Sequence, residues 1–456
     1  MSTSSSRAVF LRRLPLVALL SLAFAGASQA QSLVDIYEMA KGYDAAYLSA
    51  KAQYDANLAK ADQGKAQLLP QVGLSAGATR NQLEAHSSPE NVAYAQDRSF
   101  TTQTAGVNAT QPLYRPANLA TYRQSQKGLE LAEAALGQAD QDLIVRVSQA
   151  YFDVLNAQDS LTLVQAQKAA VSEQLASAKR NFEVGTATIT DTREAQARYD
   201  LATAQEIAAD NDLRVKTVAL ELLVGKAGLK PLRLQATTSL PPVDGQTADS
   251  WIAQSEEAHP ALRLARANLD IAKLETEKAV AGHKPTVDFT LGYNVQKNLN
   301  GTNVSTFQGY TTQATIASAG ITATLPLFAG FATQNRIRET TALEEKARLD
   351  LEGAQRQVSQ ATRTAYLGLQ SGLGQVKAYE AAETSSQVAL DANKLGYQVG
   401  VRINIDVLNS QSQLYQTKRD LAKARYDVLV GQLKLRQAAG VLKADDLQPI
   451  NRLLAP

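Results

Sequence analysis

The residues most able to do chemistry are few in this sequence, and they are scattered. The histidines are His86, His259 and His283, which lie in a polar loop, before Pro260 and before an expected strand, without the spacing of metal ligands. The chain has no cysteine, which excludes disulfides, thiolate metal sites and thiol nucleophiles. No glycine-rich phosphate loop or nucleophile elbow occurs. We therefore predict no catalytic, metal or cofactor site, and the sequence does not indicate an enzyme.

One short pattern occurs twice. The stretches NFEVGTATITD (181–191) and GYQVGVRINID (396–406) share an aromatic residue, a valine, a glycine and an aspartate at the same spacing. Gly185 and Asp191 in the first stretch correspond to Gly400 and Asp406, which lie 215 residues later. The same offset sets LLPQVGLSAG beside HKPTVDFTLG and AYFDVL beside AYLGLQ. A period this long exceeds the roughly 20 to 50 residues of solenoid repeats, so it indicates an old duplication within one chain.

The first thirty residues have the features of a secretory signal peptide. Arg7, Arg12 and Arg13 precede the apolar run LPLVALLSLAFA, and Ser28-Gln29-Ala30 forms the exit that a signal peptidase reads. We expect export, with the mature chain beginning at Gln31. The domains are then a signal peptide at 1–30, a first repeat at 31–240, and a second repeat at 241–456 that ends in a C-terminal equatorial segment.

Charge and hydropathy restrict how the exported chain could meet a membrane. The sequence has 46 basic and 44 acidic residues, and three arginines leave with the signal peptide, so the mature chain is close to neutral. No later apolar run reaches about 18 residues, which excludes a transmembrane helix. The absence of cysteine also excludes an acylated N-terminal cysteine. Any role in a membrane would have to use β-strands.

Each half reads as a helix, a strand pair, a very long helix and a further helix. In the second half, residues 287–296 alternate between apolar and polar, and the returning strand runs to 325 with its phase blurred at Gly320. The corresponding hairpin of the first half, from Val72 to Ala109, is less apolar. We expect Pro112 and Pro326 to end the two returning strands, because proline has no N–H for the ladder.

The longest segments predict helices of unusual length. Residues 117–184 and 332–399 contain no proline and few glycines, which predicts helices of about 68 residues and roughly 100 Å. In the segment that follows the second helix, large residues recur every seven positions with small residues three places later, which suits coiled-coil packing. The large residues are Val407, Leu414, Leu421, Val428 and Leu435. For a single helix, an ordinary amphipathic bundle helix is the alternative.

Strands with one apolar face fit either a soluble β-domain or a barrel that spans a bilayer. Four strands cannot close a barrel, since about eight is the practical minimum, so a barrel would need strands from several chains. The fold class that we predict is mainly α with a β-barrel portion, built by internal duplication. Its helices are long and have the periodicity of coiled coils.

The sequence resembles the TolC family of outer membrane ducts over essentially the whole mature chain. The residues that carry the resemblance are the run from AYFDVLNAQ to QARYD, the two strands that end at proline, and YQVGVRINIDVLNSQSQLYQTKRDLAKARYDVLVGQL. The resemblance implies a homotrimer in which each protomer gives four strands to a trimeric 12-stranded transmembrane β-barrel in the outer membrane of a Gram-negative bacterium. The helices would form a long α-helical coiled-coil tunnel in the periplasm.

The same resemblance implies the function and the partners. Members of the family serve tripartite efflux and type I secretion, docking onto a periplasmic adaptor (membrane fusion) protein and an inner membrane transporter, and they have no catalytic activity. Small molecules and proteins are both possible cargo, and no nucleic acid is expected as a partner. The alternative function is an exported coiled-coil scaffold or adhesin without a channel.

The resemblance also assigns roles to the repeated pattern. Gly185 and Gly400 would form turns at the periplasmic tips, where a helix of each half turns back and glycine permits the backbone to turn. Residues at four latch positions would hold the tunnel entrance closed, and the alternative for them is a helix-capping Thr-Asp and a solvated arginine. The latch residues are Thr190, Asp191, Tyr397 and Arg402.

Two further positions correspond to a pair of pore-facing aspartates in the family. Here the first is Asp406, and the second is occupied by Asn409. Three residues along a helix is close to one turn, so both side chains would face the same opening. We expect a single ring of carboxylates at the periplasmic entrance, with a solvated carboxylate at the start of a helix as the alternative for Asp406.

Overall fold

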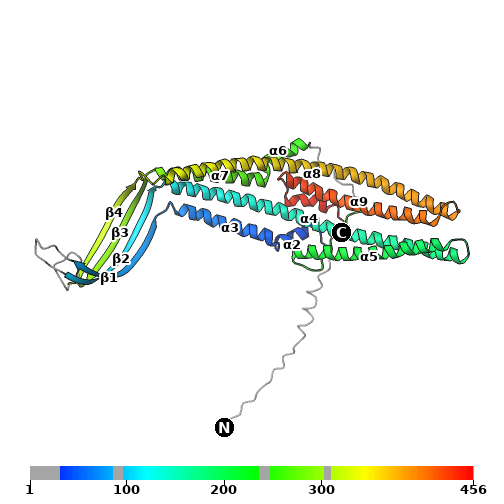
Figure 1. Cartoon of the computed structure of the whole chain (residues 1–456), viewed down its shortest axis with the longest axis horizontal. Coiled ribbons are helices and arrows are strands. Elements are labelled where there is room, and N and C mark those ends of the chain that lie inside the picture. Colours follow the sequence, from blue (N-terminus) through cyan, green and yellow to red (C-terminus); the bar gives the residue numbers. More distant parts are fainter. Residues whose placement is uncertain (1–30, 86–95, 236–246, 302–309, 455–456) are drawn as a thin grey trace, which may run out of the picture.

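The computed structural model describes residues 31–85, 96–235, 247–301 and 310–454. The predicted signal peptide at 1–30, the predicted repeat boundary at 240 and His86 lie outside these residues. The molecule is elongated, with the strands at one end and paired helices running to the other (Figure 1).

The two repeats contain the same order of α-helices and strands, and the second has one short 3₁₀ helix in addition. The first consists of α2 (Leu33–Lys41), α3 (Ala45–Ala66), β1 (Gln71–Ala85), β2 (Gln96–Tyr114), α4 (Pro116–Glu183) and α5 (Ile189–Val224). The second consists of α6 (Ala248–Ala258), α7 (Pro260–Val280), η1 (Ala281–His283), β3 (Thr286–Leu299), β4 (Thr312–Thr324), α8 (Ala332–Gln398) and α9 (Asn404–Ala438). The chain ends with η2 (Ala444–Asp446) and α10 (Leu447–Asn451). At 68 and 67 residues, α4 and α8 have the predicted length.

The strands form one antiparallel sheet in the order β1-β2-β3-β4. Residues that face each other across an antiparallel pair lie on the same side of the sheet. Val72, Ala109, Leu291 and Ala319 form one such row, and Leu74, Val107, Tyr293 and Ala317 form the next. One side of the sheet is therefore largely apolar.

The other side of the sheet is largely polar. Asn81 donates to Thr102 Oγ1 (3.4 Å), Thr102 donates to Asn298 Oδ1 (2.9 Å), and Asn298 donates to Thr312 Oγ1 (3.4 Å), so hydrogen bonds cross all four strands. The register of β4 is continuous past Gly320, which places Ile316 on this polar side. No bulge shifts the strand at Gly320, so the break in the apolar-polar alternation of the sequence is real. Ile316 is an apolar residue on the polar side of the sheet.

The prediction that Pro112 ends a strand is wrong. β2 continues to Tyr114, and the register with β3 shifts between Pro112 and Tyr114. A bulge at this point interrupts the ladder locally, so a residue without an N–H is accommodated inside the strand. Pro326 does follow the end of β4 at Thr324.

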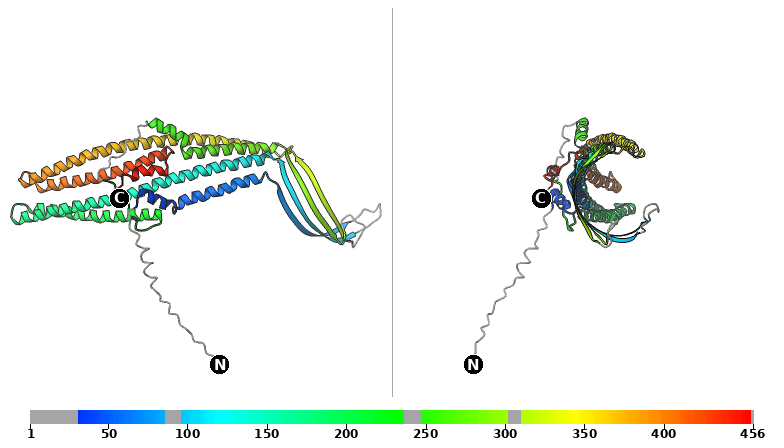
Figure 2. Two further views of the ribbon diagram at one scale, coloured as in Figure 1. Left: turned by 180° about the vertical axis from the view of Figure 1, so that it is seen from behind. Right: turned by 90° about the vertical axis from the view of Figure 1, so that its left-hand side faces the viewer.

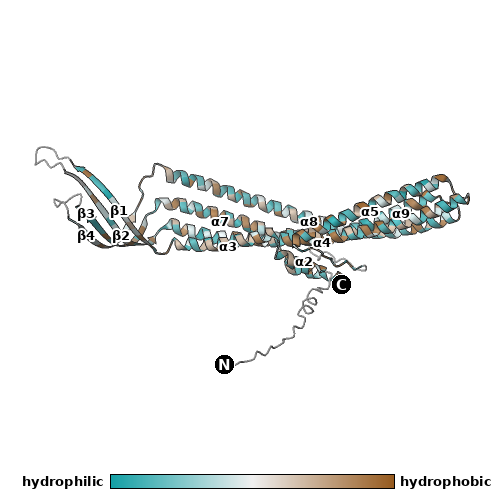
Figure 3. Ribbon diagram, turned by 90° about the horizontal axis from the view of Figure 1, so that it is seen from below, coloured by the Kyte–Doolittle hydropathy of each residue, from teal (hydrophilic) through white to brown (hydrophobic). Residues whose placement is uncertain are grey.

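The helices form a curved layer. α4 packs against α3, α5, α7 and α9, while α8 packs against α6, α7 and α9. Viewed along the long axis, helices and strands follow an arc (Figure 2, right). Hydrophilic and hydrophobic residues alternate along the long helices (Figure 3). Among the described residues, no helix is both long enough and apolar enough to cross a membrane.

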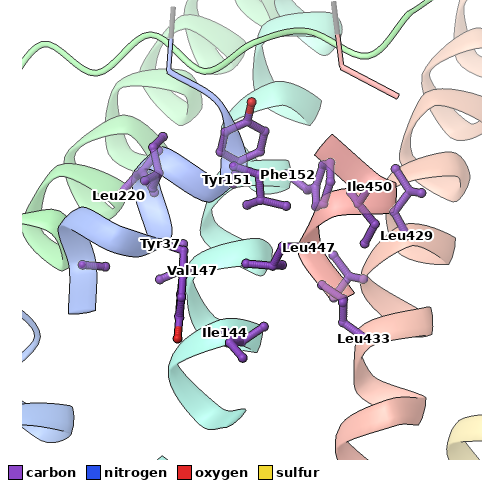
Figure 4. Packing of buried hydrophobic residues seen from close by; sticks show 14 of the residues in the cluster. Tyr37, Ile144, Val147, Tyr151, Phe152, Leu220, Leu429, Leu433, Leu447 and Ile450 are labelled. Atoms are coloured by element: carbon purple, nitrogen blue, oxygen red, sulfur yellow. The ribbon is translucent and has the colours of Figure 1, made fainter. Parts of the chain in front are cut away.

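The largest core lies in the middle of the molecule, where α2 and α10 meet α4 and α9 (Figure 4). Phe152 lies between Tyr151 and Tyr426, with ring centroids 5.5 and 5.7 Å away. Tyr426 donates a hydrogen bond to Asp159 Oδ2 at 2.6 Å, so its buried hydroxyl is satisfied. This core anchors the long helices whose far ends carry the repeated pattern.

Candidate functional site

The repeated pattern forms two helical turns at the end of the molecule opposite the strands (Figure 1). We name them tip 1 (residues 181–191, between α4 and α5) and tip 2 (residues 396–406, between α8 and α9). At tip 1, Gly185 has φ +79° and its N–H donates to the Phe182 carbonyl at 3.0 Å. The N–H of Thr186 donates to the Asn181 carbonyl at 2.8 Å. This pair of bonds is a Schellman motif, which satisfies carbonyls at the end of a helix and requires a left-handed residue.

Tip 2 repeats the same geometry. Gly400 has φ +80° and donates to the Tyr397 carbonyl at 3.1 Å, while Val401 donates to the Gly396 carbonyl at 2.9 Å. Apart from the glycine itself and its two chain neighbours, no residue has an atom within 4 Å of the position that a Cβ would take on either Gly185 or Gly400. Glycine is thus required at both turns by backbone conformation rather than by crowding.

The helices that leave the two tips begin differently. At tip 1, Thr188 caps α5: its Oγ1 accepts from the Asp191 N–H (3.2 Å), and the Asp191 carboxylate accepts from the Thr188 N–H (2.9 Å). This reciprocal capping box uses the Asp191 side chain. At tip 2 the corresponding N-cap is Ile403, which has no side-chain acceptor.

The missing cap leaves Asp406 available for another partner. Arg402 Nη1 lies 3.5 Å from Asp406 Oδ2, with side-chain exposures of 58% and 33%. Equivalent aspartates in the two repeats therefore have different partners, a capping threonine in one and an arginine in the other. An exposed pair of this kind contributes little to stability, on the order of 0.5 kcal/mol.

Several hydrogen bonds join the two repeats near the tips. Asn181 Nδ2 donates to the Tyr397 hydroxyl at 3.3 Å. Arg198 Nη2, on α5, donates to Asn409 Oδ1 on α9 at 2.7 Å.

A buried asparagine adds a third connection. The Asn404 side chain is fully buried, accepts from Gln174 and donates to the Asp191 carbonyl at 3.4 Å. In the repeat, Asn404 corresponds to Ile189 of tip 1. An amide in place of an apolar residue was the one sequence signal for the contacts of Asn404.

Apolar contacts fix the helices beside these polar bonds. Leu408 of α9 is buried in a cluster with residues of α4 and α5, namely Val171, Leu175, Ala178 and Ala195. Tyr397 packs against Leu390, Val407 and Leu414. The five large heptad residues of α9 are all buried, as the coiled-coil pattern predicted.

The predicted latch residues lie close together only in part. Asp191, Tyr397 and Arg402 line one cleft of about 600 Å³ between the tips. Thr190 is exposed and does not line it, and within the described part of the chain its side chain makes no hydrogen bond. The sequence did not indicate Asn181, Gln174 or Arg198, because nothing in their local pattern distinguishes them from other polar residues of long helices.

Neither tip contains a constellation suited to catalysis. Among the described residues, no group of three or more acidic, histidine or cysteine side chains could hold a metal ion. His259 instead caps α7, where its Nδ1 accepts from the Ala261 N–H at 3.1 Å. Two matched turns at the ends of helices about 100 Å long, beside a sheet with one apolar side, suit a conduit better than a reaction centre.

Comparison with known proteins agrees with this arrangement. A family model described as "Outer membrane efflux protein" matches residues 36–226 and 251–441, the two halves of the chain. The chain belongs to the outer membrane efflux protein family. It is 32% identical over 422 residues to the outer membrane protein TolC of Vibrio cholerae serotype O1, which covers 92% of this chain and 93% of that protein. It is 31% identical over 425 residues to the alkaline protease secretion protein AprF of Pseudomonas aeruginosa, covering 92% and 86%.

Solved structures share the fold at lower identity. The outer membrane protein VceC of Vibrio cholerae matches with a TM-score of 0.75 at 19% identity, covering 90% of this chain and 96% of that chain. The CmeC outer membrane channel of Campylobacter jejuni matches with a TM-score of 0.75 at 16% identity, covering 94% and 91%. These likenesses concern the fold alone.

Family membership confirms several predictions from the sequence. The chain is a TolC-like duct of the outer membrane for efflux or secretion, with a helical periplasmic part, and it is not an enzyme. The alternative of an exported scaffold or adhesin without a channel is not favoured.

Proposed function

We propose that three copies of this chain assemble into one export duct. The observation that carries the proposal is the strand order, which leaves one edge of β1 and one edge of β4 without a partner among the described strands. In a bilayer, the backbone groups of such edges must be paired, because no water is there to bind them. Strands of neighbouring copies can pair with both edges.

Twelve strands suit a duct better than eight. Two copies would supply eight strands, and the interior of an eight-stranded barrel is filled by side chains or holds one small ligand. Three copies supply twelve strands and leave room for passage. The apolar rows that contain Val72 and Leu74 would then face lipid, and the Asn81–Thr102–Asn298–Thr312 row would line the lumen.

The curved layer of helices would continue the duct on the periplasmic side (Figure 2). Its tips would face a periplasmic adaptor protein and an inner membrane transporter, which supply the cargo and the energy. The relative AprF is named for alkaline protease secretion, and the solved structures include channels of outer membranes. Proteins and small molecules are both suitable cargo for one open tube.

The tips would form the closed entrance of this duct. In the trimer, the latch would consist of Asp191, Tyr397 and Arg402 in their shared cleft, together with Thr190 at the rim. Support comes from the bonds that already join the tips, such as that of Asn181 with Tyr397. Each such bond is worth about 1 kcal/mol, so a docking partner could break several of them.

Asp406 and Asn409 would line the narrowest part of the entrance. Three Asp406 carboxylates, one from each copy, would attract cations, since charges between low-dielectric walls focus the potential. The Arg402 guanidinium 3.5 Å from Asp406 would weaken this attraction within each copy. Asn409, held by Arg198, would add polarity without charge.

Reconstitution of the detergent-purified protein into planar bilayers tests the proposed function. We expect stable single-channel conductance with a preference for cations, and the heat-denatured protein is the control. A protein that leaves the membrane fraction without detergent and shows no conductance would support a scaffold instead.

A further inference from the structure

Gln31 makes two hydrogen bonds with the backbone of Lys230, one through its own backbone and one through its side chain. Its backbone N–H donates to the Lys230 carbonyl at 2.9 Å, and its side-chain Oε1 accepts from the Lys230 N–H at 2.7 Å. The backbone nitrogen and the side-chain carbonyl of Gln31 are therefore both directed at the same residue. The Gln31 carbonyl is also fixed, because it accepts from the Leu232 N–H (3.1 Å) and the Tyr151 hydroxyl (3.3 Å).

This arrangement concerns the residue at which the mature chain is expected to begin. Signal peptidase cleavage after Ala30 would convert the Gln31 backbone nitrogen from an amide into a primary amine. An α-amino group has a pKa of about 7.7 to 8.0, so roughly a tenth of it is neutral and nucleophilic at pH 7. The Cδ of its own side-chain amide is an electrophile that this amine can reach by closing a five-membered ring.

We propose that Gln31 of the mature chain cyclises to pyroglutamate at this position. The neutral α-amine attacks Cδ of the same side chain, the N–Cδ bond forms, and the bond from Cδ to Nε2 breaks. Nε2 takes up the proton that the attacking nitrogen loses and leaves as ammonia. Neither an oxidant nor a co-reactant is required, and the product is a neutral five-membered lactam.

The Lys230 backbone contacts both the attacking nitrogen and the carbonyl oxygen of the amide that is attacked. Its N–H lies on Oε1, where negative charge develops when the amine adds to Cδ, and such a donor stabilises the tetrahedral intermediate. Its carbonyl accepts from the attacking nitrogen and fixes the direction of that nitrogen. Lys230 would thus assist the reaction through its main chain, and its side chain has no part in it.

The product keeps the contacts that the reactant makes. The lactam still has one N–H for the Lys230 carbonyl and one carbonyl for the Lys230 N–H. The ring also removes a positive charge beside a half-buried β-bridge to Pro231, where a charged group loses part of its hydration. Cyclisation would therefore close the N-terminus and protect it from aminopeptidases without disturbing the bridge.

Mass spectrometry of the full-length protein, isolated from the membrane fraction, tests the proposal. Free amines are labelled before digestion, so that cyclisation during sample handling is distinguished from cyclisation in the folded protein. We expect most N-terminal peptides to begin at residue 31, to be unlabelled, and to be lighter than free glutamine by one ammonia. A labelled Gln31 amine in most molecules would overturn cyclisation, and a peptide that begins elsewhere would overturn its premise, the cleavage site.

Two variants separate assisted from unassisted cyclisation. Lys230→Pro removes the N–H on Oε1, whereas Lys230→Ala keeps it and removes only the side chain. We expect freshly exported Lys230→Ala to cyclise at the wild-type rate and Lys230→Pro to cyclise about tenfold more slowly. If Lys230→Pro does not fold, the cyclisation rate of the wild type is measured in the folded protein and in urea instead. Unfolding in urea also removes the Lys230 N–H from Oε1. Equal rates in these comparisons would overturn the role of Lys230.

Discussion

Gly185 and Gly400 adopt left-handed backbone conformations, and no neighbouring atom competes for the space beside them. An alanine at either position must adopt this conformation at a cost of about 1 kcal/mol. We expect Gly185→Ala and Gly400→Ala to speed hydrogen exchange at their own tip, with Gly→Asn having a smaller effect at each site. Unchanged exchange in both alanine variants would mean that the turns can re-form without a left-handed residue.

Thr188 and Thr190 provide a matched pair two residues apart. Thr188 caps α5 through the Asp191 N–H, and Thr190 is exposed with no such bond. Loss of the cap in Thr188→Ala should destabilise the first turn of α5 by about 1 kcal/mol, measured by hydrogen exchange at tip 1. Thr190→Ala is the control and should leave exchange in isolated protomers unchanged. If Thr190→Ala were the more disruptive, the capping assignment would be wrong.

Removing either member of the Arg402–Asp406 pair should change the cation selectivity of the channel, in opposite directions. Arg402→Gln removes the guanidinium beside the carboxylate, so cation selectivity in planar bilayers should increase. Asp406→Asn removes the carboxylate itself and should largely abolish the selectivity. Both effects should weaken with salt, because charges are screened over about 10 Å at 0.1 M. Selectivity that responds to neither variant would place Asp406 away from the passage.

At the scale of elements, the start of α3 is tied to α4 by Asp44. Its carboxylate accepts two hydrogen bonds from Arg146, at 2.9 and 3.0 Å, and one from the Tyr47 N–H at 2.8 Å. Burial alone would raise the pKa of Asp44, but these hydrogen bonds and the Arg146 charge outweigh it and hold the pKa below the ordinary value of 3.8. The stabilisation is therefore present above pH 3.8 and is lost as the pH falls through the lower pKa of the folded state.

Asp44→Asn tests this pH dependence, because asparagine still caps a helix but carries no charge. We expect the variant to be less stable than the wild type at pH 7 by about 2 kcal/mol in urea unfolding. The difference should shrink as the pH is lowered below about 4. A difference that stays constant with pH would show that the carboxylate charge does not contribute.

The sequence predicted most elements because their signals are local. The lengths of α4 and α8, the heptad of α9 and the alternation in β3 each depend on nearby residues. The strand end at Pro112 was wrong because a bulge, which depends on pairing with β3, absorbs the proline. The polar contacts between the tips could not be predicted, since Arg198 and Asn409 are more than 200 residues apart and meet only through the packing of α5 and α9.

At the scale of the whole molecule, duplication explains why one chain has two tips and two hairpins. Each repeat keeps the glycine turn, and the repeats differ at the residue that begins the next helix, Thr188 or Ile403. That single difference gives Asp191 a structural partner and leaves Asp406 to Arg402. The duplication could be recognised in the sequence, but the different partners of Asp191 and Asp406 could be seen only in the structure.

The number of copies in the membrane-extracted protein tests the central claim most directly. Native mass spectrometry in mild detergent measures this number without assuming a shape. Three copies of the mature chain are expected, because twelve strands close a passage that neither four nor eight can provide. A mass of one or two copies, from protein that still conducts ions in bilayers, would contradict the trimeric duct.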